Sequence, residues 1–308
     1  GLSLHNRVVV SPMATYSAVD GLPNDFHLTH LTARALGGAG LVMTEMTCVS
    51  PDGRITSGCT GLWNEEQQAA WARIVDAVHR HSGARIGMQL GHAGPKGATG
   101  IPWEAEDQPL GEAGWPLLAA SAEPWSPRHA TPKSMTAGDM EAVRNAFTDA
   151  ARRALAAGFD WLELHCAHGF LLNAFLSPLT NDRTDAYGGS FDNRIRLPLE
   201  IAHEVRAIWP QDKPLFVRIS AVDGNREGWT IEDSVAFAKN LKTIGVDVVD
   251  CSSGGFGAFE YPNGYGFQVP FAAQIRREAG IETMAVGLIV DPLQAEAVIA
   301  SGQADLVA

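Results

Sequence analysis

The sequence contains few cysteines and few basic residues. The four cysteines, Cys48, Cys59, Cys166 and Cys251, are far apart and form no CxxC pair, which argues against a disulfide framework or a structural zinc site. Lysine and arginine total 23 against 35 acidic residues, giving a net charge of -12. Nucleic acids and anionic membranes are therefore not expected partners.

Long apolar runs are also missing. No run reaches the roughly 18 residues of a membrane-spanning helix, and the first residues lack the charged and then apolar pattern of a signal peptide. Together with the unpaired cysteines, this predicts a cytoplasmic protein. Hydrophobic residues make up 45% of the 308 residues, enough to bury the core of one α/β barrel.

Short apolar runs alternate with longer segments of helical periodicity, the pattern of parallel strands joined by crossover helices. Eight segments are predicted strands: 8–11, 41–45, 86–90, 161–165, 215–220, 246–251, 283–287 and 305–308. Seven helical crossovers separate them, among them 65–80, 137–157, 231–244 and 292–300. Strict alternation favours a closed TIM (β/α)₈ barrel, and no GxGxxG follows the first strand to suggest a dinucleotide fold.

Residues 1–308 are expected to form a single domain, truncated within the eighth strand. Two connections between strands and helices are long, at 91–135 and 168–190. Both leave the face of the barrel on which TIM-barrel enzymes carry their active sites. We expect them to cover the substrate.

Polar residues and glycines lie at the C-terminal ends of the predicted strands or just beyond them, where a TIM barrel places its active site. In strand order they are Ser11, Pro12 and Met13; Glu45 and Met46; Gln89; His165 and His168; Arg218; Ser252, Ser253, Gly254 and Gly255; and Gly287. Core packing does not account for this convergence, so we expect an active site there.

The histidine pair allows two interpretations. With a carboxylate such as Glu163 or Glu45, His165 and His168 would form the ligand set of a metal-dependent hydrolase. Alternatively, the two imidazoles would donate hydrogen bonds to a carbonyl, nitro or phenolate oxygen. Arg218 disfavours a metal, because its permanent positive charge opposes a cation and suits an anionic reduced flavin.

Two further features fit a flavin. Gln89 can donate and accept at once, which matches the pyrimidine edge of the ring system. Gly254, Gly255 and Gly287 allow a close backbone approach, and TIM barrels usually bind phosphate after strands seven and eight.

Several sequence blocks resemble the Old Yellow Enzyme family, in particular its small bacterial ene-reductases. The blocks are NRVVVSPMATY at 6–16, QLGHAG at 89–94, HCAHGFLLNAFLSP at 165–178, NDRTDAYGGSFDNR at 181–194, LFVRIS at 215–220, DCSSGG at 250–255 and AVGLI at 285–289. The resemblance implies an FMN-dependent enzyme, reduced by NADH or NADPH, that delivers hydride to the β-carbon of a small molecule with a conjugated carbonyl.

The resemblance also implies roles for individual residues. His165 and His168 would hold the electron-withdrawing oxygen, with Tyr16 over the substrate. The cofactor would contact Ser11, Pro12, Met13, Ala14, Met46, Gln89, Arg218, Ser253, Gly254 and Gly287.

The sequence departs from the family pattern at three positions. Phe170 stands where a tyrosine usually donates a proton, so water or Tyr16 would supply it, or the substrate would need no enzyme acid. Ala14 replaces a frequent flavin-tuning cysteine. Pro95 replaces an arginine, which leaves Lys96 to meet anionic substrate groups, and Phe170 and Lys96 are the expected substrate contacts.

These departures, with MTEMTCVSPDGRITSGCTGLW at 43–63, resemble the reductase half of bifunctional aryl-CoA monooxygenase-reductases such as salicylyl-CoA 5-hydroxylase. That resemblance implies a dearomatised aryl-CoA substrate and a covalently linked FAD monooxygenase module. A homo-oligomer is also expected. Two alternatives stay open, the metal-dependent hydrolase and a barrel that has lost its activity and serves as a scaffold.

Overall fold

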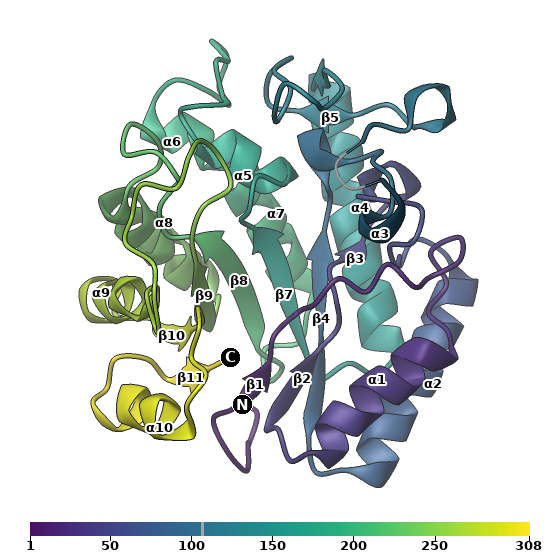
Figure 1. The fold of residues 1–308 in the computed structure, drawn as a ribbon, viewed down its shortest axis with the longest axis vertical. Coiled ribbons are helices and arrows are strands. Elements are labelled where there is room, and N and C mark those ends of the chain that lie inside the picture. Colours follow the sequence, from purple (N-terminus) through teal and green to yellow (C-terminus); the bar gives the residue numbers. More distant parts are fainter. Residues whose placement is uncertain (106–107) are drawn as a thin grey trace.

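Parallel strands form the centre of the protein in a computed structural model that describes residues 1–105 and 108–308 (Figure 1). The strand order is β1 (Val9–Val10), β2 (Leu41–Met43), β4 (Arg85–Gly91), β7 (Trp161–Cys166), β8 (Leu215–Ser220), β9 (Val248–Ser252), β10 (Glu282–Ala285) and β11 (Leu306–Val307). A bridge between Val8 and Val307 joins the first strand to the last. The predicted TIM barrel is therefore confirmed.

Each of the eight predicted segments overlaps one of these strands, but several boundaries differ. The first strand is only two residues long, and β9 begins at Val248 and continues through Ser252. Because β10 ends at Ala285, Gly287 lies two residues beyond the strand in which it was predicted. A further short strand, β3 (Thr47–Cys48), pairs with the end of β4.

Helices cover the outside of the barrel (Figure 1). The longer ones are α1 (Asp25–Leu36), α2 (Glu65–His81), α4 (Ala137–Ala156), α7 (Arg196–Ile208), α8 (Ile231–Ile244), α9 (Val269–Ala279) and α10 (Pro292–Ala300). Side-chain caps fix where several begin: Asn64, Thr136 and Thr230 accept a backbone N–H in the first turn of α2, α4 and α8. The four helices predicted by range are confirmed to within one residue. No helix of the described residues is long and apolar enough to cross a membrane.

The interior of the barrel changes from apolar to polar along the strands. At the end where the strands begin, Trp161, Phe216, Val248 and Met284 form an apolar layer. Gly87 makes room for this layer, because a Cβ on it would lie 2.0 Å from Cε2 of Trp161. Toward the other end, the inward-facing side chains become charged or polar.

The first long connection contains η2 (Gly94–Lys96), α3 (Pro102–Ala105), η3 (Gly111–Ala113), β5 (Leu118–Ala119) and β6 (Lys133–Ser134). The second contains α5 (Leu171–Leu176) and is followed by α6 (Phe191–Arg194). A further 3-10 turn, η1 (Pro51–Gly53), lies between β3 and α2. Both connections lie beyond the ends of the barrel strands, as the positions of β5 and α5 in Figure 1 show. Residues 106–107 of the first connection are outside the described part of the chain.

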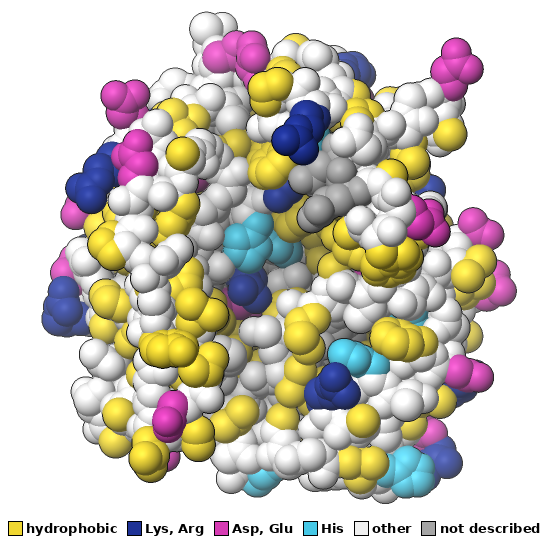
Figure 2. All heavy atoms as spheres, viewed as in Figure 1, with side chains coloured by type: hydrophobic (Ala, Val, Ile, Leu, Met, Phe, Trp, Pro, Cys, Tyr) yellow, Lys and Arg dark blue, Asp and Glu magenta, His cyan; other side chains and the backbone are white. Residues whose placement is uncertain are grey.

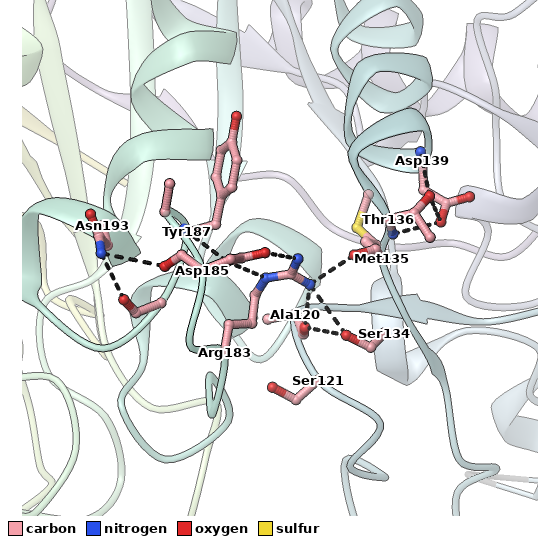
Figure 3. Close-up of polar contacts among 12 residues, drawn as sticks. Ala120, Ser121, Ser134, Met135, Thr136, Asp139, Arg183, Asp185, Tyr187 and Asn193 are labelled. Carbon is pink, nitrogen blue, oxygen red and sulfur yellow. Dashed lines mark hydrogen bonds and ion pairs between the residues drawn. The ribbon is translucent and has the colours of Figure 1, made fainter.

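Arg183 ties the two connections together (Figure 3). Its Nη1 donates to the carbonyl oxygens of Ala120 and Met135 at 2.9 and 2.8 Å and to Ser134 Oγ at 3.2 Å. Asp185 pairs with the same guanidinium at 2.5 Å. One arginine of the second connection thus fixes both ends of the β5–β6 segment of the first.

Candidate active site

Neighbouring strands bring the predicted polar residues together where the barrel opens. His165 on β7 is in register with Arg218 on β8, and Arg218 is in register with Asp250 on β9. All three side chains are buried. Figure 2 shows histidine and basic side chains at the bottom of a hollow in the middle of the drawn face.

His165 is held as a neutral hydrogen-bond donor. Its Nδ1 accepts the backbone N–H of Ala167 at 3.2 Å, so the single ring proton of the neutral form is on Nε2. No other residue in the described part of the chain bonds to that Nε2. Burial, followed by the charges of Arg218 and Lys96, lowers the pKa of His165 well below its usual range.

His168 is clamped in the left-handed backbone region, with φ of 62°. Its N–H donates to Ser220 Oγ at 3.0 Å, and its carbonyl oxygen accepts from Lys96 Nζ at 2.9 Å. The ring Nε2 lies 2.6 Å from Ser252 Oγ, and the ring centroid is 5.1 Å from that of His165. Burial and the nearby Arg218 and His165 lower the pKa of His168 well below its usual range. This strained backbone persists because partners on three sides fix it.

Two pairs of buried polar and ionisable side chains lie on the strands that carry the histidines and on their neighbours. Arg218 Nη1 is 3.2 Å from Asp250 Oδ2, while Gln89 Nε2 donates to Glu163 Oε1 at 2.7 Å. Burial raises the pKa of Asp250 to about 6, and burial together with Asp250 raises the pKa of Glu163 well above its usual range. One guanidinium therefore faces two carboxyl groups, of which Glu163 favours the neutral form.

Aromatic side chains form one wall of the site. The rings of Phe170 and His165 meet edge to face with centroids 4.8 Å apart. Phe170 and Tyr16 pack against the same small cluster, which includes Met46. Lys96 Nζ is 5.0 Å from the ring centroid of Phe170 and 4.1 Å from that of Trp125.

The residues predicted for the flavin face differ in exposure and backbone conformation. Ser11 and Pro12 are half-buried, whereas Met13 and Ala14 are exposed. Gly254, Gly255 and Gly287 have φ of 80°, 135° and 102°, which only glycine adopts readily. Ser253 Oγ donates to Gln268 Oε1 at 2.6 Å.

Two residues at the site were not predicted. Trp125 in the first connection donates its Nε1–H to the Gly255 carbonyl oxygen at 2.7 Å and thereby closes the connection over the glycine turn. Gln268 directly precedes α9 as its N-cap residue and contacts both Ser252 and Ser253. The only signal for Trp125 was the richness of residues 91–135 in tryptophan, proline and glycine, and Gln268 gave none.

A family model described as "NADH:flavin oxidoreductase / NADH oxidase family" matches residues 2–308. The chain belongs to this family. Two relatives called NADPH dehydrogenase, from Geobacillus sp. (strain WCH70) and Geobacillus thermodenitrificans (strain NG80-2), are 46% and 47% identical to it over 309 residues, covering 100% of this chain and 86% of each relative. A solved structure of morphinone reductase in complex with tetrahydroNAD has a TM-score of 0.82 at 29% identity, covering 99% of this chain and 83% of that one.

Membership in the NADH:flavin oxidoreductase family makes the protein an FMN-dependent NAD(P)H oxidoreductase. The residues present fit that cofactor. Arg218 is a buried cation whose Nε has no partner in the described part of the chain, as a group reserved for a ligand would have. Gln89 donates its amide N–H to Glu163, so its carbonyl oxygen is the group that could accept a ring N–H of the cofactor.

The contacts of Glu45 and Glu163 give no support to the metal-dependent hydrolase alternative. Glu45 is bonded by Thr15 Oγ1 at 2.5 Å and lies 3.3 Å from His27 Nε2, while Glu163 is bonded to Gln89. Within residues 1–105 and 108–308, no group of three His, Cys, Asp or Glu side chains is arranged to hold a metal ion. The carboxylates considered as third ligands therefore have other partners.

Proposed function

We propose that the protein reduces carbon–carbon double bonds conjugated to a carbonyl group. The observation that carries this proposal is the Nε2–H of neutral His165, which has no partner among residues 1–105 and 108–308 and lies beside His168 and next to the strand position of a buried guanidinium. FMN, when bound, accepts hydride from NADH or NADPH and passes it to the β-carbon of the substrate. The chain's own residues bind the oxygen on which negative charge collects.

His165 and His168 would bind the substrate's carbonyl oxygen and stabilise that charge. Neutral imidazole N–H groups suit this task, because they donate hydrogen bonds without taking up a proton at neutral pH. Removal of one such donor typically lowers turnover by about 10²- to 10³-fold. Tyr16 would lie over the substrate, where its hydroxyl is our candidate for the proton donor.

The cofactor contacts are proposals of the same kind. Gln89 and Arg218 would bind the ring, with Arg218 stabilising the negative charge of the reduced form. The backbone around the strand ends would line the rest of the cofactor, through Ser11, Pro12, Met13, Ala14, Met46, Ser253, Gly254 and Gly287.

Phe170 favours a substrate whose reduction needs no acid from the enzyme, because the proton comes from the substrate itself or from water. A phenyl ring cannot act as an acid, so a product that tautomerises or rearomatises in water fits this site best. A dearomatised aryl-CoA thioester is our candidate, with Lys96 meeting an anionic group. A linked FAD module and a homo-oligomeric assembly belong to the same proposal, which the family alone does not require.

Anaerobic stopped-flow absorbance tests the function. The FMN-loaded protein, reduced with one equivalent of NADPH, should be reoxidised by 2-cyclohexenone or by a dearomatised aryl-CoA, with the saturated product formed in equal amount. Flavin that is reduced by NADPH but reoxidised by no conjugated carbonyl would contradict the proposal and favour the scaffold alternative.

A further inference from the structure

The side chain of Gln268 is buried and contacts Ser252, which in turn contacts His168. The residue is 5% exposed, and its side chain lies between the ends of β9 and β10. Its Oε1 is 2.6 Å from Ser253 Oγ and 3.3 Å from Ser252 Oγ. On its other side, a Cβ on Gly287 would lie 2.5 Å from its Nε2, so the side chain fills the space that this glycine leaves.

The carbonyl oxygen of Gln268 sets the direction of the serine hydroxyls. An amide oxygen only accepts hydrogen bonds, so both serines donate to it. Ser252 has one proton, and once it is donated to Gln268, only lone pairs remain for His168. The contact of 2.6 Å between Ser252 Oγ and His168 Nε2 is then a hydrogen bond only if the ring proton is on Nε2.

We propose that Gln268 is a positioning residue that, through Ser252, holds His168 as the tautomer with its proton on Nε2. The backbone N–H of Ala167 selects the same tautomer of His165. Both members of the pair therefore carry their proton on the same ring nitrogen. The tautomer is a property of the chain itself, and its consequence for substrate binding rests on the proposed function.

The tautomer matters because a neutral imidazole has a single N–H. In the other tautomer Nε2 of His168 would be a lone pair, which cannot donate to a substrate oxygen. In the proposed tautomer the substrate oxygen would replace Ser252 Oγ as the acceptor of the single Nε2–H. The side-chain amide of Gln268 is also uncharged. A carboxylate in its place would favour the protonated ring, whereas an amide orients the ring and leaves it neutral.

Histidine tautomers can be read directly by two-bond ¹H–¹⁵N correlation on FMN-loaded protein labelled with ¹⁵N-histidine, at about pH 8 so that the rings are neutral. The signals of His168 are assigned by their loss in His168→Gln. We expect the wild type to show the proton on Nε2. Gln268→Met keeps the side-chain volume but removes the acceptor, so Ser252 is free to donate to Nε2, and the proton of His168 should move toward Nδ1.

Three variants complete the design. Gln268→Glu keeps an acceptor oxygen and should retain the proton on Nε2. Ser253→Ala removes the other hydroxyl on the same carbonyl and should leave the tautomer of His168 unchanged. If Gln268→Met fails to fold, Ser252→Ala tests the same link, because it removes the acceptor for Nε2–H and should give a mixture of tautomers.

In Gln268→Met we also expect binding of 4-hydroxybenzaldehyde to the oxidised holoenzyme to weaken about tenfold, as for loss of one hydrogen bond to a charged oxygen. An identical His168 tautomer in wild type and Gln268→Met, or a wild-type proton on Nδ1, would overturn the inference. Tautomers that respond as expected in a protein that reduces no enone would instead overturn the proposed function alone.

Discussion

At the scale of single residues, the environment of the histidine pair predicts an unusual pH dependence. Burial and the charge of Arg218 lower the pKa of both rings, so protonation requires a pH well below their usual 6.5. Binding of a neutral enone should therefore stay constant from about pH 8 down to about pH 6, where an unshifted histidine would be mostly charged. Enone dissociation constants across this range test it, and an inflection near the ordinary histidine pKa would count against neutral donors.

Phe170 offers a second test at this scale. If the missing acid is all that limits turnover of simple enones, Phe170→Tyr should raise kcat with 2-cyclohexenone by about 10²-fold, a typical contribution of a positioned acid. Phe170→Leu is the matched control, since it changes the wall of the site without adding a hydroxyl. Equal rates for the two variants would show that the limitation lies elsewhere.

At the scale of elements, Gly87 on β4 and Trp161 on β7 depend on each other. A methyl group on Gly87 would meet the indole at 2.0 Å, so Gly87→Ala should lower the free energy of unfolding by about 1–3 kcal/mol. Gly83→Ala is the control, because its Cβ would meet nothing closer than 3.9 Å. Urea unfolding midpoints measure both, and equal midpoints would mean that the apolar layer repacks without cost.

The long connections provide the other prediction at this scale. Arg183→Met removes the donors that hold Ala120, Ser134 and Met135, so amide exchange in residues 118–135 should accelerate and KM for substrate should rise. Arg152→Met, which removes an exposed ion pair with Asp149, should change neither. Unchanged exchange in Arg183→Met would show that the connections hold their shape without this arginine.

Sequence patterns predicted the elements of the barrel better than those above it. Parallel strands such as β7 and β8 are buried along their whole length and mostly apolar, which makes them easy to locate. The pairing of β5 with β6 was not predictable, because two-residue strands carry no periodic signal. The connections are held by side chains such as Arg183, whose partners are distant in sequence.

At the scale of the whole molecule, the histidines and Arg218 were predictable because they lie toward the C-terminal ends of strands or just beyond them, and closing the barrel brings all strand ends to one opening. Gln268 and Trp125 reach the same opening from a helix start and from a connection. Their positions depend on packing that no local pattern encodes. The ion pair of Arg218 with Asp250 likewise required the register between β8 and β9.

We propose above all that the closed barrel places His165 and His168 to bind an oxyanion beside FMN. Titration of the oxidised, FMN-loaded protein with 4-hydroxybenzaldehyde tests it most directly, followed by long-wavelength charge-transfer absorbance. We expect tight binding with a charge-transfer band in the wild type, and binding at least about tenfold weaker in His165→Ala and His168→Ala at equal FMN content. Wild-type affinity in both variants, or no band in the loaded wild type, would contradict the claim.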